Sequence, residues 1–422
     1  MKTQFYSYTQ YTGVLLCSML LLFSCTKEED GPEPGPEEKS ELVLTPSETE
    51  IDKGDTVTFE VTVDGKVIDS DIYINNDKIS GASHVFEEAG IHQVIAKKEG
   101  YTDSEAIEIK SYQVDVYVAG HDFGGAVYWK NGTIVTLTDG KKSGSRANGI
   151  VMDNGDVYVS GVDNDGVGNL AVYWKNGTRI AMATSREYPG AYGRSITVDN
   201  GDVYMAGEQS TRLPTGGAAS RTMYWKNGSP VNLGDNGRAV EIAVEDGDVH
   251  MVALETDRFK KIANYWKNGT RAELDGGDYL LTTALAVDNG DVYITGSRLV
   301  QHGNFTTGTA IYWKNGTLVT LAERTYPTDV AIDNGDVYIS ATNFDSSRNA
   351  AMYWKNNKEV FLTDGKQNSA ETTAIAVSNG DVYVAGSYDR DAVYWKNGTL
   401  IKLEGVNAEA SDIFVTRSLG EN

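Results

Sequence analysis

Residues 126–132 read Ala126-Val127-Tyr128-Trp129-Lys130-Asn131-Gly132, and the repetition of this stretch decides the fold. Its core, Tyr-Trp-Lys-Asn, occurs seven times at intervals of 41 to 51 residues. The repeats contain all seven tryptophans of the protein: Trp129, Trp174, Trp225, Trp266, Trp313, Trp354 and Trp395. A second motif, Asp-Val-Tyr-Val-Ala-Gly, keeps step with the first and begins, with variations, at Asp115, Asp156, Asp202, Asp248, Asp291, Asp336 and Asp381. Periods of 40 to 50 residues with several short strands each are typical of β-propeller blades.

Each repeat is expected to form four strands, which we call a to d. In one copy they are Thr283–Val287, Asp291–Gly296, Ala310–Lys314 and Thr317–Leu321. An Asn-Gly pair separates a from b and c from d, and this pair supplies the positive φ angles that two-residue hairpin turns need.

The ends of the repeat region predict a closed ring. The first copy begins at strand b, Val114–Gly120, and lacks a strand a of its own, whereas Ser411–Val415 follows the last copy without a partner. We therefore expect the C-terminal strand to complete the first blade, which gives seven blades and hides the edges of an open array. The propeller is expected to span residues 113–417.

The repeat resembles the HAF family of extracellular repeat proteins. The likeness is carried by Ala126–Gly132 and Asn154–Gly161, in the pattern Ala-x-x-Trp-x-Asn-Gly, then an Ala-x-x-Ile strand, then Asn-Gly-x-Val-x-x-x-Gly. It implies an extracellular propeller and no defined activity. The Tyr-Trp core is also similar to the YWTD propellers of lipoprotein receptors. Because Lys-Asn replaces Thr-Asp in every copy, the ligands of that family are not carried over.

Residues 41–112 predict a separate small β-sandwich. Thr56–Val63 alternates with a period of two and is followed by Asp64-Gly65, a hairpin signal. Further short alternating runs bring the expected total to six or seven strands. The segment is similar to the immunoglobulin-like spacer domains of secreted bacterial lipoproteins, although it lacks the cysteine and tryptophan landmarks of antibody domains.

The first 40 residues predict export and a lipid anchor. Val14–Phe23 is an apolar run of ten, too short to span a bilayer and typical of a secretion signal. Leu22-Phe23-Ser24-Cys25 resembles the bacterial lipobox, which implies residues 1–24 as the signal peptide and acylation of Cys25; a plain signal peptide is the alternative. Residues 25–40 are acidic and proline-rich, as in an extended tether. Their first residues are similar to the export signal of Bacteroidetes surface lipoproteins, which implies an outer-membrane, surface-exposed protein.

The net charge argues against a nucleic-acid partner. The 422 residues include 60 acidic and 37 basic side chains, a net charge of −23 that repels phosphate backbones. Residues 1–110 hold 22 of the acidic and 9 of the basic groups, so more than half of the excess lies in the first quarter of the chain. The membrane is expected to be contacted only through the lipid, and the protein to be a monomer.

Catalytic and metal-binding patterns are weak. No repeat contains the Ser-x-Asp-x-Gly-x-Thr-Trp box of sialidases, and the five histidines show no spacing typical of a metal site. Asp163-Asn164-Asp165-Gly166 is a fragment of a calcium loop without the remaining ligands, so a polar turn explains it better. We expect neither a metal nor another cofactor, and we favour binding over catalysis.

The recurrent Asp-Asn-Gly-Asp turns are explained as structure, since a catalytic pair would be placed once. Strand b begins where strand c ends, so its first Asp is expected to face the Lys of Tyr-Trp-Lys. Asp156–Lys175 and Asp291–Lys314 are examples, and such pairs stabilise by roughly 0.2–1 kcal/mol each. The Asn-Gly-Thr/Ser sequons, such as the one at Asn131, belong to the same turns and are interpreted as hairpin chemistry.

The b–c and d–a connections vary in length, whereas the a–b and c–d turns hardly change. Both variable connections must lie on one side of the ring, which we call the variable face; the opposite side is the tight-turn rim. Variable loops on a rigid scaffold are the usual place of function. We expect these connections to hold the ligand-binding residues Phe123, Tyr188, Tyr192, Phe259, Tyr279, His302, Phe305, Tyr326, Phe344 and Tyr388. The alternative is that these rings cap the blade cores under their own loops.

Three hypotheses of function follow. The first is a non-catalytic module that binds a glycan or an extracellular protein through aromatic rings and arginines of the variable face. The second is a polysaccharide hydrolase or lyase, which requires two carboxylates about 5–10 Å apart at the mouth of the central channel. The third is a scaffold between envelope proteins, which requires large flat patches.

Overall fold

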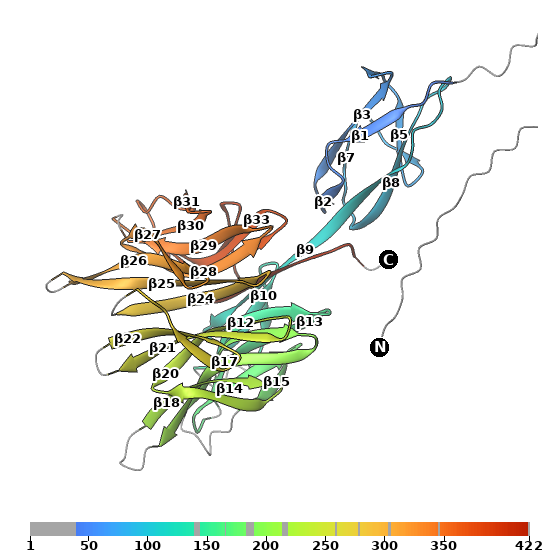
Figure 1. Cartoon of the computed structure of the whole chain (residues 1–422). Helices are drawn as coiled ribbons and strands as arrows, with labels where there is room; N and C mark the ends of the chain where they lie inside the picture. Colours follow the sequence, from blue (N-terminus) through green and yellow to red (C-terminus); the bar gives the residue numbers. More distant parts are fainter. Residues whose placement is uncertain are drawn as a thin grey trace, which may run out of the picture.

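The computed structural model describes residues 39–138, 144–164, 166–182, 190–212, 218–257, 260–276, 279–302, 305–344 and 347–420. Within these ranges the chain forms 36 strands and no helix, so the described part contains no helix that could cross a membrane. The expected signal peptide, Cys25 and the expected tether up to residue 38 lie outside the described residues. The chain folds into a seven-bladed β-propeller preceded by a small immunoglobulin-like sandwich (Figure 1).

The sandwich has two sheets that enclose a core of aliphatic residues, Phe59 and Phe86. In one sheet β3 pairs with β1, β4 and β7; in the other the order is β9-β8-β5-β6, and β2 lies parallel to β9. The strands are β1 (Val43–Pro46), β2 (Glu50–Asp52), β3 (Thr56–Val63), β4 (Lys66–Val67), β5 (Asp71–Ile74), β6 (Asp77–Lys78), β7 (Ser83–Val85), β8 (Gly90–Lys97) and β9 (Ile107–Asp122).

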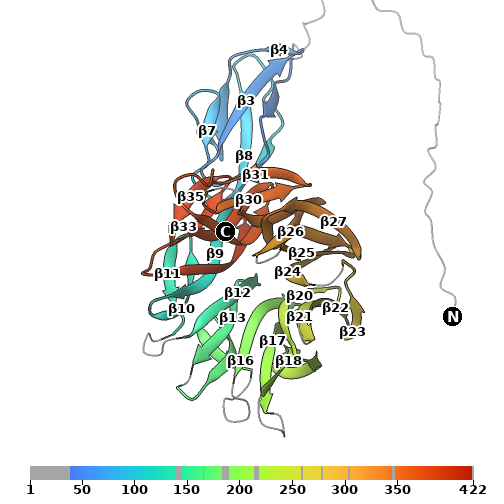
Figure 2. The ribbon, with the colours of Figure 1, turned by 90° about the vertical axis from the view of Figure 1, so that its left-hand side faces the viewer.

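Seven four-stranded antiparallel blades surround one axis, which Figure 2 views from the variable face. Blade 1 combines β36 (Glu409–Ser418), β9, β10 (Gly125–Lys130) and β11 (Thr133–Thr136). Blade 2 has β12 (Arg146–Asp153), β13 (Asp156–Asn164), β14 (Asn169–Lys175) and β15 (Thr178–Ala181). Blade 3 has β16 (Ala191–Asp199), β17 (Asp202–Arg212), β18 (Ala218–Lys226) and β19 (Ser229–Asp235).

The remaining blades repeat this order of strands. Blade 4 has β20 (Gly237–Glu245), β21 (Asp248–Asp257), β22 (Lys260–Lys267) and β23 (Thr270–Glu273). Blade 5 has β24 (Leu280–Asp288), β25 (Asp291–His302), β26 (Phe305–Lys314) and β27 (Thr317–Glu323). Blade 6 has β28 (Thr325–Asp333), β29 (Asp336–Asn343), β30 (Ala350–Lys355) and β31 (Lys358–Phe361). Blade 7 has β32 (Ala370–Ser378), β33 (Asp381–Tyr388), β34 (Asp391–Lys396) and β35 (Thr399–Lys402).

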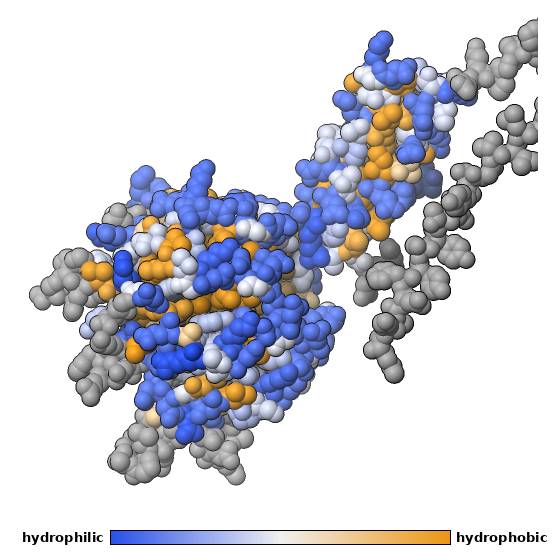
Figure 3. Space-filling model, viewed as in Figure 1, coloured by the Kyte–Doolittle hydropathy of each residue, from blue (hydrophilic) through white to orange (hydrophobic). Residues whose placement is uncertain are grey.

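The C-terminal strand closes the ring, which confirms the prediction. β36 pairs antiparallel with β9, and it is longer than the expected Ser411–Val415. All seven tryptophans are at most 2 % exposed and lie between successive blades, where large rings bury the most area. The outer strands present a mainly hydrophilic wall on the side seen in Figure 3.

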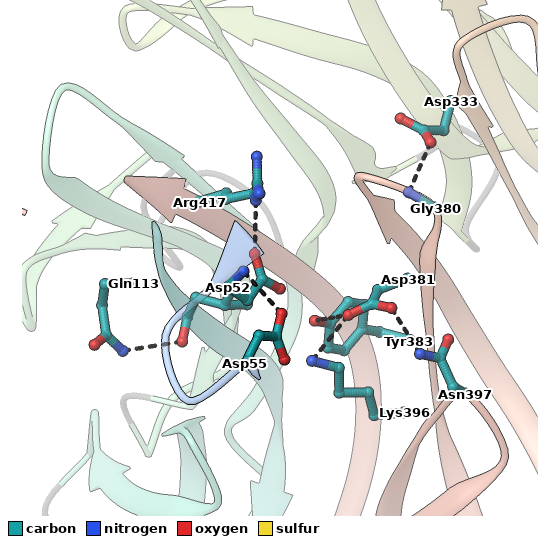
Figure 4. A network of polar contacts seen from close by, with 11 residues as sticks. Asp52, Asp55, Gln113, Asp333, Gly380, Asp381, Tyr383, Lys396, Asn397 and Arg417 are labelled. Atoms are coloured by element: carbon teal, nitrogen blue, oxygen red, sulfur yellow. Dashed lines mark hydrogen bonds and ion pairs between the residues drawn. The ribbon is translucent and has the colours of Figure 1, made fainter. Parts of the chain in front are cut away.

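The sandwich and the propeller share a strand and a partly buried ion pair. β9 runs without a break through the expected boundary at residue 112, so it belongs to both domains. Arg417 of β36 lies 3.7 Å above the ring of Tyr112 and pairs with Asp52 at 2.7 Å (Figure 4). Because β9 enters blade 1 at Asp115, on the tight-turn rim, the variable face lies on the far side of the propeller from the sandwich (Figure 1).

Candidate functional site

The repeated Asp, Lys and Asn side chains form one structural network in every blade. In blade 7, Asp381 accepts hydrogen bonds from Lys396 at 2.9 Å and from Asn397 at 2.7 Å, while the Asn397 amide oxygen accepts the Val382 N–H (Figure 4). The expected pairs Asp156–Lys175 and Asp291–Lys314 are confirmed at 2.6 and 2.8 Å. The asparagine also takes the positive φ of the c–d turn. The carboxylates of the tight-turn rim are therefore engaged in holding the hairpins.

A second repeated feature lies at the axis: every strand a carries a β-bulge at its third or fourth residue, near the variable face. A bulge sets two residues of one strand against one of its neighbour. The bulged residues are Asn148, Arg194, Val240, Thr283, Thr328, Thr373 and Ser411. The residues that follow them are Gly149, Ser195, Glu241, Ala284, Asp329, Ala374 and Asp412. With the exception of Ala284, all of these line one cavity of about 220 Å³, which we call the axial cavity.

The side chains of the axial cavity bridge neighbouring blades. Asp412 of blade 1 accepts the Ile150 N–H of blade 2 at 2.8 Å. Asp329 of blade 6 accepts the Ile375 N–H of blade 7 at 2.9 Å. Similar bonds run from Ser195 of blade 3 to Glu241 of blade 4 and from Asn148 of blade 2 to blade 3. The two aspartates satisfy backbone donors and Asn148 satisfies the Gly193 carbonyl, so the cavity residues have a structural role in addition to any ligand contact.

Three carboxyl groups in this cavity are hard to ionise. Burial raises the pKa of Asp329 to about 6, and burial together with the charge of Asp329 raises that of Asp412 to about 7. Burial, then the charges of Asp329 and Asp412, holds the pKa of Glu241 well above its ordinary value. As whole residues, all three acids are half-buried. At neutral pH the cavity therefore offers both hydrogen-bond donors and acceptors.

These acids are not among the site residues predicted from the sequence. A signal was present, since Glu241, Asp329 and Asp412 occupy the position at which two other blades have alanine. That signal becomes visible only when the strands are aligned by their bulges. In the part of the chain that the structure describes, no group of three or more His, Cys, Asp and Glu side chains is placed to hold a metal ion.

Of the expected ligand-binding rings whose side chains the structure describes, three are exposed in connections between strands. Phe123 is 84 % exposed, Tyr279 42 % and Phe344 38 %. The ring of Phe344 packs edge-on against that of Tyr326 at 5.2 Å between centroids. Tyr279 has a φ of 65°, a conformation that is a genuine outlier for a bulky side chain. Such strain is often retained at functional positions.

Five other residues lie in strands, so their placement in loops was wrong. The blade hairpins extend beyond the repeated motifs, because the backbone ladder continues into the variable segments: Tyr192 is in β16, His302 in β25, Phe305 in β26, Tyr326 in β28 and Tyr388 in β33. Only the backbones of His302 and Phe305 are described, and they pair with each other. Tyr188 and Phe259 lie outside the described residues.

Two of these tyrosines are held by their hydroxyl groups, as in the alternative in which the rings cap the blades. The Asn169 amide donates to the Tyr192 hydroxyl at 2.7 Å, and the Asn368 amide donates to the Tyr388 hydroxyl at 3.0 Å. Tyr192 lies two residues from Arg194, and Tyr326 two residues from Thr328, so both flank strand positions that line the axial cavity.

No family model matches the chain, and no curated protein sequence does; the resemblance to the HAF family therefore stays a prediction. Similar solved structures include an auxiliary nutrient-binding protein from Bacteroides ovatus, with 14 % identity, 82 % of this chain and 96 % of that chain covered, and a TM-score of 0.36. A nidogen/laminin complex has 10 % identity, coverages of 72 % and 98 %, and a TM-score of 0.36. Sucrose-6-phosphate hydrolase from Lactobacillus gasseri has 10 % identity, with 64 % of this chain and 90 % of that chain covered, and a TM-score of 0.37. Likeness at this level carries no argument about function.

Proposed function

We propose that the protein binds carbohydrate on its variable face, with a sugar residue in the axial cavity. The observation that supports this most is the cavity itself, to which all seven blades contribute mainly polar side chains. Hydroxyl, amide and carboxyl groups that converge on one point suit a ligand with many hydroxyl groups. The exposed rings of Tyr279 and Phe344 belong to the same face and can stack on the apolar side of a sugar.

The charge of the cavity selects an uncharged ligand. Three carboxyl groups face one guanidinium, that of Arg194, which already pairs with Glu208. An anionic sugar would add a further negative charge to this group. We therefore expect neutral glycans to bind and uronate or sulfate substituents to be rejected from the axial cavity.

A glycan array followed by titration calorimetry on the purified full-length chain tests the proposal. We expect the affinity for a bound neutral glycan to fall at least tenfold in the variants Tyr279→Ala and Phe344→Ala. Phe361→Ala is the matched control, because Phe361 is also exposed but lies on the outer strand β31. A folded protein that binds no glycan would refute the proposal.

The three carboxyl groups also favour a second candidate, a glycoside hydrolase. A carboxyl group with a raised pKa can act as a general acid while an ionised neighbour acts as base or nucleophile. Incubation of the protein with its bound glycan distinguishes the two functions. Release of new reducing ends, lost in Asp329→Asn and Asp412→Asn, would establish hydrolysis; an unchanged glycan would leave binding as the function.

We further propose that Cys25 anchors the protein in the outer membrane, at the cell surface. The attachment of the sandwich to the tight-turn rim supports this arrangement, because the variable face then lies away from the anchored end. Metabolic labelling with a palmitate analogue tests the anchor. Label is expected in the wild-type chain and absent from the Cys25→Ala variant; label in both would refute it.

A further inference from the structure

A groove of about 610 Å³ lies between blades 3 and 4 on the variable face. Its apolar lining comes from Ala219 and from Leu254, which is mostly buried. Its polar lining comes from Glu208, Ser220, Asn236, Arg238 and Lys261. Arg238 and Lys261 are exposed. An apolar patch with hydrogen-bonding edges matches a sugar ring, which has an apolar face and hydroxyl groups around it.

The groove and the axial cavity share a wall. Arg194 lines the axial cavity, and Glu208 lines the groove. The Arg194 guanidinium contacts the Glu208 carboxylate through Nη2 at 2.5 Å and through Nε at 3.2 Å to both oxygens. The Glu208 side chain is only 8 % exposed, so this bidentate pair is fixed in place. A chain that ends in the axial cavity would cross this pair to reach the groove.

The two volumes differ in what they can hold. Small-molecule sites usually measure about 300–1,000 Å³, so the groove falls within that range and the axial cavity lies below it. A ligand confined to the axial cavity would make few contacts. Most of the contact area for a longer ligand would come from the groove.

The two volumes also differ in charge. Arg194 compensates the carboxylate of Glu208, and Arg238 and Lys261 add positive charge at the groove. The axial cavity instead holds three acids. A carboxylate or sulfate substituent is therefore compatible with the groove and incompatible with the cavity.

We propose that the groove is a second subsite for the same ligand, so that the protein recognises an oligosaccharide with an uncharged terminal residue in the axial cavity and the following residues across the Arg194–Glu208 pair. This inference rests on the proposed carbohydrate binding and adds the length and direction of the ligand. Arg238 and Lys261 act in it as specificity-determining residues for the inner sugars.

The test uses linear α-1,4- and β-1,4-linked glucose oligomers and β-1,4-linked xylose oligomers of one to five residues, titrated into the full-length chain. We expect the affinity for a bound series to rise at least tenfold from one to three residues. The double variant Arg238→Ala/Lys261→Ala should lose this gain and keep the affinity for the monosaccharide. Both side chains are exposed, so the variant is expected to fold. Lys358→Ala, an exposed lysine of the outer strand β31, is the matched control.

The outcomes separate the two proposals. Equal affinity at all lengths, or a double variant that binds every length as the wild type does, would overturn the groove subsite and leave carbohydrate binding intact. No binding of any of these series counts against the groove subsite. If the glycan array is also negative, carbohydrate binding fails as well.

Discussion

The Asp412→Asn substitution is expected to make the unfolding free energy of the propeller less dependent on pH. The pKa of Asp412 is about 7 in the folded protein, against 3.8 ordinarily. The folded state therefore holds more protons than the unfolded state between about pH 4 and pH 7. The contribution of the protonated Asp412 carboxyl to the unfolding free energy is fully present below about pH 4 and is lost as the pH rises through 7. An asparagine does not ionise, so the variant lacks this loss.

The size of the effect follows from the two pKa values. They differ by about 3, which corresponds to about 4 kcal/mol at 1.36 kcal/mol for each pKa unit. About two thirds of the interval between the two pKa values lies between pH 5 and pH 8, and Asp412 is half-buried as a residue. We therefore expect the variant to gain about 1–2 kcal/mol relative to the wild type between these pH values. The amide oxygen retains an acceptor for the Ile150 N–H, whereas the acceptor for the Ile413 N–H is lost. The cost of that loss does not depend on pH, so it leaves the difference between the two pH values unchanged.

Urea unfolding followed by tryptophan fluorescence measures this difference, because all seven tryptophans lie in the propeller. Asp381→Asn is the control: the pKa of Asp381 is lowered below 3.8, although burial opposes the shift, by the hydrogen bonds from Asn397 and Lys396. The ionised Asp381 carboxylate stabilises the fold above about pH 4, and this contribution is lost only in acid. The Asp381→Asn substitution should therefore change the unfolding free energy by the same amount at pH 5 and pH 8. A pH-independent effect of Asp412→Asn would show that this carboxyl does not titrate between pH 5 and pH 8 in the folded protein, and would refute the reasoning.

Three further predictions concern the fold. A Cβ on Gly207 would lie 2.0 Å from a backbone oxygen of β16, so Gly207→Ala should lower the unfolding free energy of the propeller by about 2–4 kcal/mol in urea titrations. Ala253→Gly in blade 4, the corresponding position, should cost only about 1 kcal/mol. A stop after Glu404 removes β36 and opens the ring, so light scattering should detect aggregation through the unpaired edge of β9. Arg417→Met breaks the pair with Asp52, and small-angle scattering should then show a broader range of domain orientations; an unchanged profile would mean that β9 alone fixes the junction.

Most of the fold was predicted from the repeated motifs. Each Tyr-Trp-Lys-Asn-Gly stretch contains its own burial signal, its own turn and its own partner for the Asp of the neighbouring strand, so local sequence sufficed. Ring closure followed from counting strands at the two ends. The continuous β9 was not predicted, because nothing in the local sequence distinguishes two successive strands from one long strand whose two parts pair with different neighbours.

The candidate site was predicted less well. Aromatic residues of the variable segments were recognised as candidates. Tyr192 and Tyr326 nevertheless lie within strands, because the hydrogen bonds between two antiparallel strands continue for as long as the strands remain side by side. Exposure could not be assigned from composition either: Phe344 is exposed, whereas the Tyr388 hydroxyl is held by Asn368. Whether a ring faces water depends on neighbours that are not adjacent in sequence.

The sequence by itself determined seven blades, their closure by the C-terminal strand and the Asp–Lys pairs of the tight-turn rim, because each depends on interactions within a repeat or between adjacent strands. Only the tertiary structure decided the axial cavity and the groove. Asp412 and the Ile150 N–H that it accepts are 262 positions apart in the chain. Seven bulges form one polar cavity only when the closed ring brings seven separate strands to a common axis, and a single repeat contains no trace of that convergence.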